Sequence, residues 1–249
     1  MRFDVITLFP EIFHAVTDCG ITARALKRGL WSCHTWNPRM VTEDLHRTVD
    51  DRPFGGGPGM VMMAEPLAKT LEAIRASGNR GRLISFAPNG RHLTDKKVRE
   101  WVSEREDMVL LCGRYEGIDE RFLSTYVDEV ISLGDFVLSG GELPACALID
   151  AVVRQLPGAI KTLSYEDESF ATGLLDAPHY TRPEVWRGMP VPEVLLSGHH
   201  ANIAKWTREE SLRFTLQNRP DLITIAHSSG LLSMADYRWL EAAGWKKPS

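Results

Sequence analysis

Three glycine-containing loops that lie close together in this sequence could bind a small molecule. Two short apolar runs, 108–112 and 129–133, end next to a glycine, and polar loops follow them at 113–117 and 134–136. A third loop, Ser139-Gly140-Gly141, leads into an apolar segment. Glycine lets the backbone approach a ligand closely, and loops at the carboxyl ends of parallel strands bind ligands in open α/β sheets. The three loops together predict one small-molecule pocket.

The stretch at 50–60 also has an unusual composition. Four glycines and two prolines occur within seven residues, which excludes a helix or a central strand. Flexible linkers of this kind are usually rich in serine, whereas this one lies between Asp-Asp-Arg-Pro-Phe and Met-Val-Met-Met. We therefore expect a functional loop held against the core. Neither a P-loop nor a G-x-G-x-x-G motif after a strand occurs, which argues against a phosphate-cradling loop.

Charge and cysteine content limit the classes of function. The 249 residues carry a net charge of −4 with a pI near 6.1, so any nucleic-acid contact requires a local basic patch. The cysteines at 19, 33, 112 and 146 form no C-x-x-C pair, which indicates reduced, mostly buried thiols in a cytoplasmic protein and no metal site. No run reaches the roughly 18 apolar residues of a membrane span, and the N-terminal run indicates a strand rather than a signal peptide.

Strand and helix patterns alternate from residue 3 to residue 155. Short apolar runs bounded by glycine or proline predict strands at 3–9, 31–36, 82–87, 108–112 and 129–133. Helical spacing predicts helices at 11–16, 21–28, 65–76, 94–105, 119–126 and 142–155. The apolar stripe of the last helix is expected to contain Leu143, Ala147, Leu148, Ala151 and Val152. This order predicts an α/β fold with a mainly parallel sheet and helices on its faces.

The composition changes after Pro157-Gly158. Residues 159–175 have weak periodicity and several acids, which indicates a linker or a loop that becomes ordered on binding. Helices are expected at 200–217 and 231–243, with Pro220 between them. The first helix has a basic side, which Glu209 and Glu210 dilute, and a charged helix face is usually only solvated. Its cations are Lys205, Arg208 and Arg213, with Arg219 just beyond.

Five motifs give the whole chain a specific resemblance to a known family. They are Thr7-Leu8-Phe9-Pro10, the run 50–60, Leu111-Cys112-Gly113-Arg114-Tyr115-Glu116-Gly117, the run 132–142, and Pro178-His179-Tyr180-Thr181-Arg182-Pro183. In this order they resemble the bacterial tRNA (guanine-N1-)-methyltransferases of the SPOUT class. The resemblance implies an α/β domain with a C-terminal trefoil knot, followed by a small all-helical domain. The expected boundaries are 1–158 for the methyltransferase domain, 159–175 for a linker and 176–249 for a helical tRNA-binding domain.

The same resemblance implies an activity and its partners. Members transfer a methyl group from S-adenosylmethionine to N1 of guanine 37, immediately 3′ of the anticodon, when another guanine precedes it, and so maintain the reading frame. They are cytoplasmic homodimers whose active site is shared between subunits. We expect no membrane or DNA partner and no bound metal in the protein itself, and we leave a requirement for Mg²⁺ open.

The resemblance also assigns site residues. The methyl donor is expected to contact Phe86, Pro88, Gly113, Arg114, Tyr115, Glu116, Gly117, Ser132, Leu133, Gly134, Phe136, Leu138, Gly140, Gly141 and Pro144. Negative charge builds on guanine O6 as N1 loses its proton, so a cation there would stabilise the transition state. The family's arginine for this role matches Arg154. Lys205, Arg208 and Arg213 are expected to bind the tRNA.

Two positions depart from the family pattern. The family reads Asp-Ser-Phe in the linker, with the aspartate as the proposed base, whereas this chain reads Glu168-Ser169-Phe170. This alignment makes Glu168 the general base, with Asp167 as the rival, and the alternative is that both are solvated charges. Phe136 stands where many members have tyrosine.

Two other functions remain open at this stage. One is a non-catalytic RNA-binding protein that kept the fold, which the intact glycine loops argue against. The other is a SPOUT enzyme that methylates a ribose hydroxyl. The linker carboxylates and the His-Tyr-Thr-Arg run favour a base nitrogen instead.

Overall fold

The computed structural model describes residues 1–160 and 168–247. The chain divides into two compact units, Met1–Thr162 and Leu163–Ser249, and each is described by itself. Asp167 and Glu166, two of the acids noted in the linker, lie outside the described residues.

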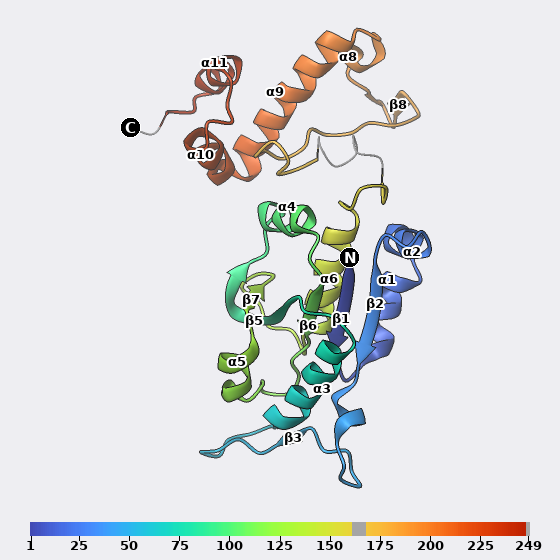
Figure 1. Ribbon diagram of the computed structural model, residues 1–249. Helices are drawn as coiled ribbons and strands as arrows, with labels where there is room; N and C mark the ends of the chain where they lie inside the picture. Colours follow the sequence, from blue (N-terminus) through green and yellow to red (C-terminus); the bar gives the residue numbers. More distant parts are fainter. Residues whose placement is uncertain (161–167, 248–249) are drawn as a thin grey trace. The chain divides into compact units, whose positions relative to one another are not determined.

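A five-stranded sheet forms the centre of the first unit (Figure 1). Its strand order is β2-β1-β6-β5-β7, and each neighbouring pair runs parallel. The mainly parallel sheet predicted from the sequence is therefore confirmed. The strands are β1 (Arg2–Ile6), β2 (Ser32–Trp36), β5 (Arg82–His92), β6 (Met108–Leu111) and β7 (Glu129–Ser132).

Helices cover both faces of this sheet, because successive side chains of a strand point to opposite sides. In β6, Met108 and Leu110 belong to one buried cluster, while Val109 and Leu111 belong to the other. The first cluster includes residues of α1 (His14–Thr17), α2 (Gly20–Lys27), α4 (Asp95–Glu104) and α6 (Glu142–Val153). The second includes residues of α3 (Ala64–Ala76) and α5 (Glu120–Tyr126). The described part of this unit also contains two short 3-10 helices, η1 (Pro10–Phe13) and η2 (Pro38–Val41).

Local signals placed most of these elements correctly. The side chain of Thr94 accepts a hydrogen bond from the backbone N–H of Lys97, and that of Asp119 from the N–H of Arg121, so both act as helix N-caps. The strand predicted at 3–9 was too long, because β1 ends at Ile6 and the hydroxyl of Thr7 accepts from the N–H of Phe9 in a turn. The strand predicted at 82–87 was too short.

The extension of β5 contains a bulge. Phe86 and Arg91 both pair with Ile131 of β7, so the four residues between them leave the ladder. The segment Pro88-Asn89-Gly90 thus lies inside the strand as a bulge beside β7.

The buried side of α6 differs from the predicted stripe. Leu148 and Val152 are buried as expected, but Leu143 is 58% exposed and Ala147 is also exposed. Ala145, Ile149 and Val153 are buried instead. The helix is apolar around most of its circumference, so periodicity could not identify the side that faces the sheet.

The second unit contains α8 (Glu193–Leu196), α9 (His200–Asn218), α10 (Pro220–Ser228) and α11 (Met234–Ala242). Leu174, Leu212, Ile223, Ala226, Leu232 and Leu240 form its buried cluster. Pro220 was expected to lie between two helices, but in the structure it is the first residue of α10. An N–H at this helix position has no partner within the helix, so the N–H that proline lacks is not missed. A short hairpin, β8 (Val185–Trp186) with β9 (Met189–Pro190), makes the unit mainly rather than wholly helical.

Candidate functional site

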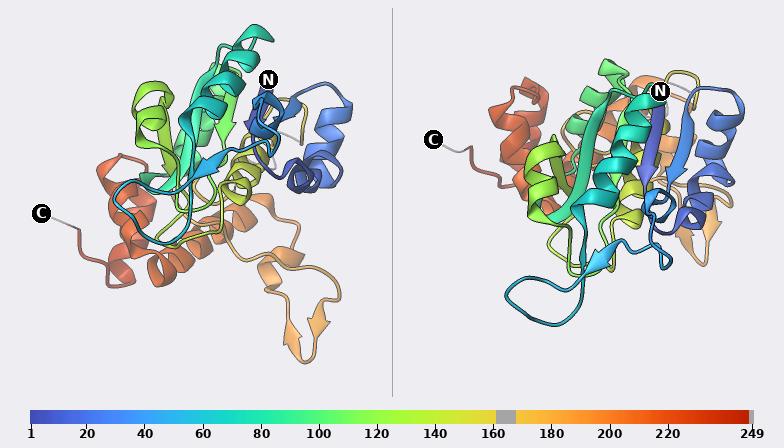
Figure 2. Two further views of the ribbon diagram at one scale, coloured as in Figure 1. Left: turned by 90° about the horizontal axis from the view of Figure 1, so that it is seen from below. Right: turned by 60° about the horizontal axis from the view of Figure 1, so that its bottom comes forward.

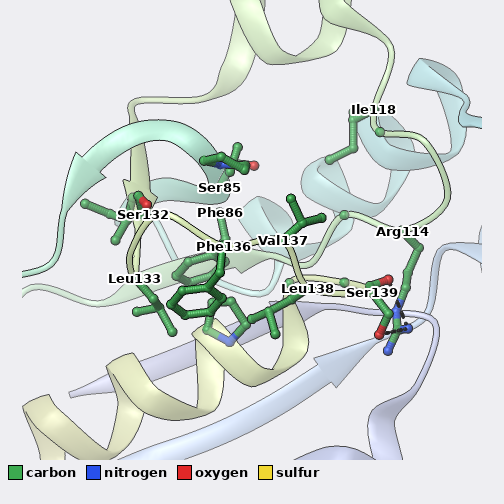
Figure 3. A pocket seen from close by; sticks show the side chains of 18 of the residues that line it. Ser85, Phe86, Arg114, Ile118, Ser132, Leu133, Phe136, Val137, Leu138 and Ser139 are labelled. Carbon is green, nitrogen blue, oxygen red and sulfur yellow. Dashed lines mark hydrogen bonds between the residues drawn. The ribbon is translucent and has the colours of Figure 1, made fainter.

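One pocket gathers the glycine loops that follow β6 and β7 and that precede α6, together with a segment inside β5 (Figure 3). Every residue that the resemblance assigns to the methyl donor lines it: Phe86, Pro88, Gly113, Arg114, Tyr115, Glu116, Gly117, Ser132, Leu133, Gly134, Phe136, Leu138, Gly140, Gly141 and Pro144. Ser85, Ala87, Ile118, Val137 and Ser139 are among the further lining residues. The structure thus joins the three loops in one pocket. Their binding of a methyl donor stays a prediction.

The pocket combines apolar walls with backbone groups. Phe86, Leu133 and Phe136 are among the apolar side chains that line it (Figure 3). A Cβ at Gly141 would stand 2.8 Å from the Cα of Cys112, so only glycine allows the two segments to pack this closely. Among the described residues that line the pocket, Arg114 and Glu116 are the charged ones.

A buried carboxylate lies behind this lining. Glu142, the first residue of α6, is 1% exposed. Its Oε1 accepts a hydrogen bond of 2.9 Å from the hydroxyl of Thr7, and its Oε2 lies 2.9 Å from Nε of Arg114. The latter contact is an ion pair without hydrogen-bond alignment. Glu142 and Thr7 appeared in the sequence only as letters of two motifs, and nothing there indicated that they meet.

The loop at 50–60 connects a two-stranded hairpin, β3 (Asp50–Asp51) and β4 (Val61–Met62). Its base is tied to the pocket, because the N–H of Glu116 donates to the carbonyl of Met60 and the N–H of Met62 donates to the carbonyl of Gly117, both at 2.9 Å. The middle of the loop stands away from the sheet (Figure 2), and Phe54 is 98% exposed. The loop is therefore held against the rest of the unit at its base, as the sequence predicted, whereas Phe54 in its middle is exposed.

Tyr115 connects this hairpin to the pocket by a second route. Its hydroxyl accepts a hydrogen bond of 3.1 Å from Nη2 of Arg39, a side chain that also lies 3.8 Å from Asp50. Burial raises the pKa of the Tyr115 hydroxyl, and the hydrogen bond with Asp50 raises it further. Tyr115 is therefore a neutral hydrogen-bonding group at neutral pH.

The two predicted catalytic residues are not part of the pocket lining. Arg154 is the C-cap residue of α6, is half-buried and belongs to the first unit. Glu168 is half-buried and belongs to the second unit, where its carbonyl accepts from the N–H of Ala171. The rival base, Asp167, lies outside the described residues.

The predicted tRNA-binding cations each lie beside a carboxylate on the second unit. Lys205 Nζ is 3.8 Å from Glu209, and Arg213 pairs with Glu210. Arg208 makes two hydrogen bonds of 3.0 Å to the two oxygens of Asp236, which also belongs to the capping box of α11. Burial alone would raise the pKa of Asp236, but Arg208 and the groups of Ser233 lower it below its usual value. The stability from this pair is thus present at neutral pH and is lost as the pH falls through the lowered pKa.

Replacing Arg208 by Gln should therefore destabilise the second unit. It would leave Asp236, whose side chain is 6% exposed, without its cation. We expect a loss of about 2–3 kcal/mol, less than for a fully buried pair because Arg208 is itself partly exposed. Urea unfolding of the full chain measures this, with Lys205→Gln as the control. Equal stability of the two variants would contradict a structural role for Arg208.

Other reactive groups give no second site in the described part of the chain. Burial raises the pKa of Cys33 to about 12 and that of Cys146 to about 11, so both are thiols at neutral pH. Residues 1–160 and 168–247 contain no cluster of three or more His, Cys, Asp or Glu residues that could hold a metal. They also contain no helix long and apolar enough to cross a membrane.

The chain is similar to known proteins over most of its length. The family model described as tRNA (Guanine-1)-methyltransferase TrmD matches residues 1–225. The chain is 61% identical over 228 residues to a tRNA (guanine-N(1)-)-methyltransferase of Thiobacillus denitrificans, covering 90% of this chain and 96% of the relative. It is 58% identical over 247 residues to the same-named protein of Burkholderia cenocepacia, covering 96% of this chain and 93% of the relative.

Proposed function

The chain belongs to the tRNA (guanine-1)-methyltransferase family, and from this premise we propose that it methylates N1 of the guanine immediately 3′ of the anticodon, when another guanine precedes it. The methyl donor is S-adenosylmethionine. The observation that best supports this function is the single pocket formed by the three glycine loops. The family membership supports the tRNA substrate and the N1 atom, whereas the position within the tRNA rests on the motif resemblance.

The composition of the pocket fits this donor. An adenine ring requires apolar walls and a few backbone donors and acceptors, and Phe86, Leu133 and Leu138 lie among glycine-rich backbone. The donor supplies a methyl group on a sulfonium whose charge disappears on transfer. We further propose that the chain around the pocket forms a trefoil knot. The close packing of Gly141 on Cys112, with the N–H of Gly141 donating to the carbonyl of Gly113, supports it.

The chain's own residues must remove the guanine N1 proton and stabilise the charge that develops. We assign the proton to the carboxylate of Glu168, which is suited to the task if it reaches N1–H at hydrogen-bond distance. We assign stabilisation of negative charge on O6 to Arg154. We assign no residue to Mg²⁺, and assays with and without EDTA test its requirement. We propose that the reaction takes place in the cytoplasm, and the free thiols of all four cysteines support this location.

We propose that the protein acts as a homodimer with two shared active sites. The exposed apolar side of α6 supports this, because Leu143 and Ala147 would be covered by a partner. Val137 of the pocket loop, which is 85% exposed, adds to the same argument. Arg154 and Glu168 would then meet donor loops of the other subunit.

Incubating the protein with labelled S-adenosylmethionine and unmodified tRNA, followed by nucleoside analysis, tests the function. We expect 1-methylguanosine as the labelled product. A tRNA with adenine in place of the guanine before the target serves as the matched control and should remain unlabelled. A 2′-O-methylated nucleoside would indicate the ribose-methylating alternative, and the absence of label would indicate a non-catalytic RNA-binding protein.

The second unit should contribute tRNA affinity through Lys205 and Arg213. The side chains of Lys205 and Arg213 are 76% and 46% exposed, whereas Arg208 is 31% exposed and is held by the buried Asp236. Replacing both by Gln should weaken tRNA binding and reduce the salt dependence by about one unit of slope per lost phosphate contact. Binding measured over a range of salt concentrations tests this, with donor affinity as the control. If the dependence of the binding constant on salt concentration is unchanged, the two side chains are solvated charges that do not contact the tRNA.

A further inference from the structure

Glu142 is a buried acid that the methyl-transfer chemistry above does not use. Its carboxylate, 1% exposed, lies between Thr7 at the end of β1 and Arg114 of the pocket. Burying an ionised carboxylate is unfavourable unless a cation and hydrogen bonds compensate it. The hydroxyl of Thr7 and the guanidinium of Arg114 supply both. Each of these two groups, the Glu142 carboxylate and the Arg114 guanidinium, therefore compensates the charge of the other.

Arg114 is held on several sides. Its Nη1 donates a hydrogen bond of 3.2 Å to the carbonyl of Ser139, and its guanidinium carbon lies 4.4 Å from the ring centre of Phe9. Figure 3 shows Arg114 beside Ser139, at one end of the pocket. Gly140 makes this arrangement possible, since a Cβ there would overlap Arg114 and lie 2.6 Å from Oε2 of Glu142. The geometry fixes a positive charge at the wall of the pocket.

A positive charge at this wall would oppose the proposed ligand. The sulfonium of S-adenosylmethionine is a cation, whereas the thioether left after methyl transfer is neutral. The amino and carboxylate groups are the same in both molecules, so donor and product differ by one unit charge. Arg114 is the one cation among the described residues that line the pocket. Without compensation it would favour the product over the donor.

We propose that Glu142 is a positioning residue that neutralises Arg114 and holds it against Ser139, and thereby lets the pocket accept the cationic donor in preference to the neutral product. This inference rests on the proposed function, because it requires S-adenosylmethionine in this pocket. The inference goes beyond the proposed function, because it assigns the preference of the pocket for a cationic ligand to an ion pair whose acid lies behind the pocket lining. The ion pair also connects the loop at 113–117 to the start of α6.

The test is the ratio of two dissociation constants, for S-adenosylmethionine and for S-adenosylhomocysteine, measured by calorimetry on the full chain. Glu142→Gln keeps the shape of the side chain and an acceptor for Thr7, but removes the carboxylate charge beside Arg114. We expect donor binding to weaken relative to product binding on the order of tenfold, the effect of two unit charges roughly 12 Å apart at an effective dielectric constant of about 20. Product binding in the same variant also reports whether the pocket has folded.

Two further variants separate charge from structure. Thr7→Val removes a hydrogen bond to the same carboxylate but neither charge, so it should leave the ratio unchanged. The double variant Arg114→Met with Glu142→Gln removes both charges and should bring the ratio back towards that of the unmodified protein. Equal weakening of both ligands in Glu142→Gln, or no recovery in the double variant, would overturn the inference. Failure of the unmodified protein to bind either ligand would instead contradict the proposed function.

Discussion

Replacing Glu168 by Gln should lower the single-turnover rate of methyl transfer by about 10²–10⁴-fold, the usual contribution of a general base. The substitution removes the group that takes the N1 proton and keeps almost the same shape. A carboxylate with an ordinary pKa of about 4.3 is ionised at neutral pH and can accept this proton. Glutamate is one methylene longer than the aspartate of the family pattern, so its backbone would lie further back from the guanine.

The matched control for this prediction is Asp167→Asn, one residue earlier. It should leave the rate within a few-fold of normal, and donor and tRNA binding should be unchanged in both variants. A normal rate in Glu168→Gln together with a collapsed rate in Asp167→Asn would transfer the role to Asp167. Normal rates of methyl transfer in both variants would show that neither acid is the general base and that both are solvated charges.

Mixing two inactive variants should restore methyl transfer if the active sites are shared. Gly140→Trp should block the donor pocket, since even a Cβ at this position would overlap Arg114 and Glu142. Arg154→Ala should lose the charge stabilisation at O6, for which the loss of a comparable group costs about 10²–10³-fold. In a heterodimer, the intact donor loops of one subunit would meet the intact Arg154 of the other. Activity should then rise well above that of either parent, at one of the two sites.

The measurement is the rate per heterodimer, isolated by two different affinity tags. A heterodimer of the unmodified chain with Gly140→Trp is the control and shows how much one intact site can deliver. If heterodimers form but remain as inactive as their parents, Arg154 acts on the donor loops of its own subunit, and the proposed sharing of sites is wrong.

Several features of the fold could be predicted because their causes are local. The helices predicted at 94–105 and 119–126 have Thr94 and Asp119 as N-caps, side chains that act within three residues of the helix start. The alternation of strands and helices in the sequence favours a parallel sheet. The glycine loops marked the pocket for the same reason, since they follow directly on the strands that place them. The family could be identified because its motifs are long runs of neighbouring residues.

Features that depend on which side of an element is covered could not be predicted. The nearly uniform apolar surface of α6 contains no signal that Leu143 is exposed while Ile149 is buried. The basic side of α9 likewise gave no indication that Arg208 is held by Asp236, a partner 28 residues further along the chain. Such pairings depend on how the elements pack, and periodicity within one element contains no information about its neighbour.

The sequence by itself determined the order of the elements, the position of the pocket loops and the family, because each depends on residues close together in the chain. Only the tertiary structure decided that the acid after Gly140-Gly141 lies against Arg114 and against Thr7, which is 135 residues away in sequence. The physical reason is that a buried charge must be compensated wherever the fold brings a partner within reach. Which group becomes that partner depends on how the elements pack and not on the separation of the two residues in sequence.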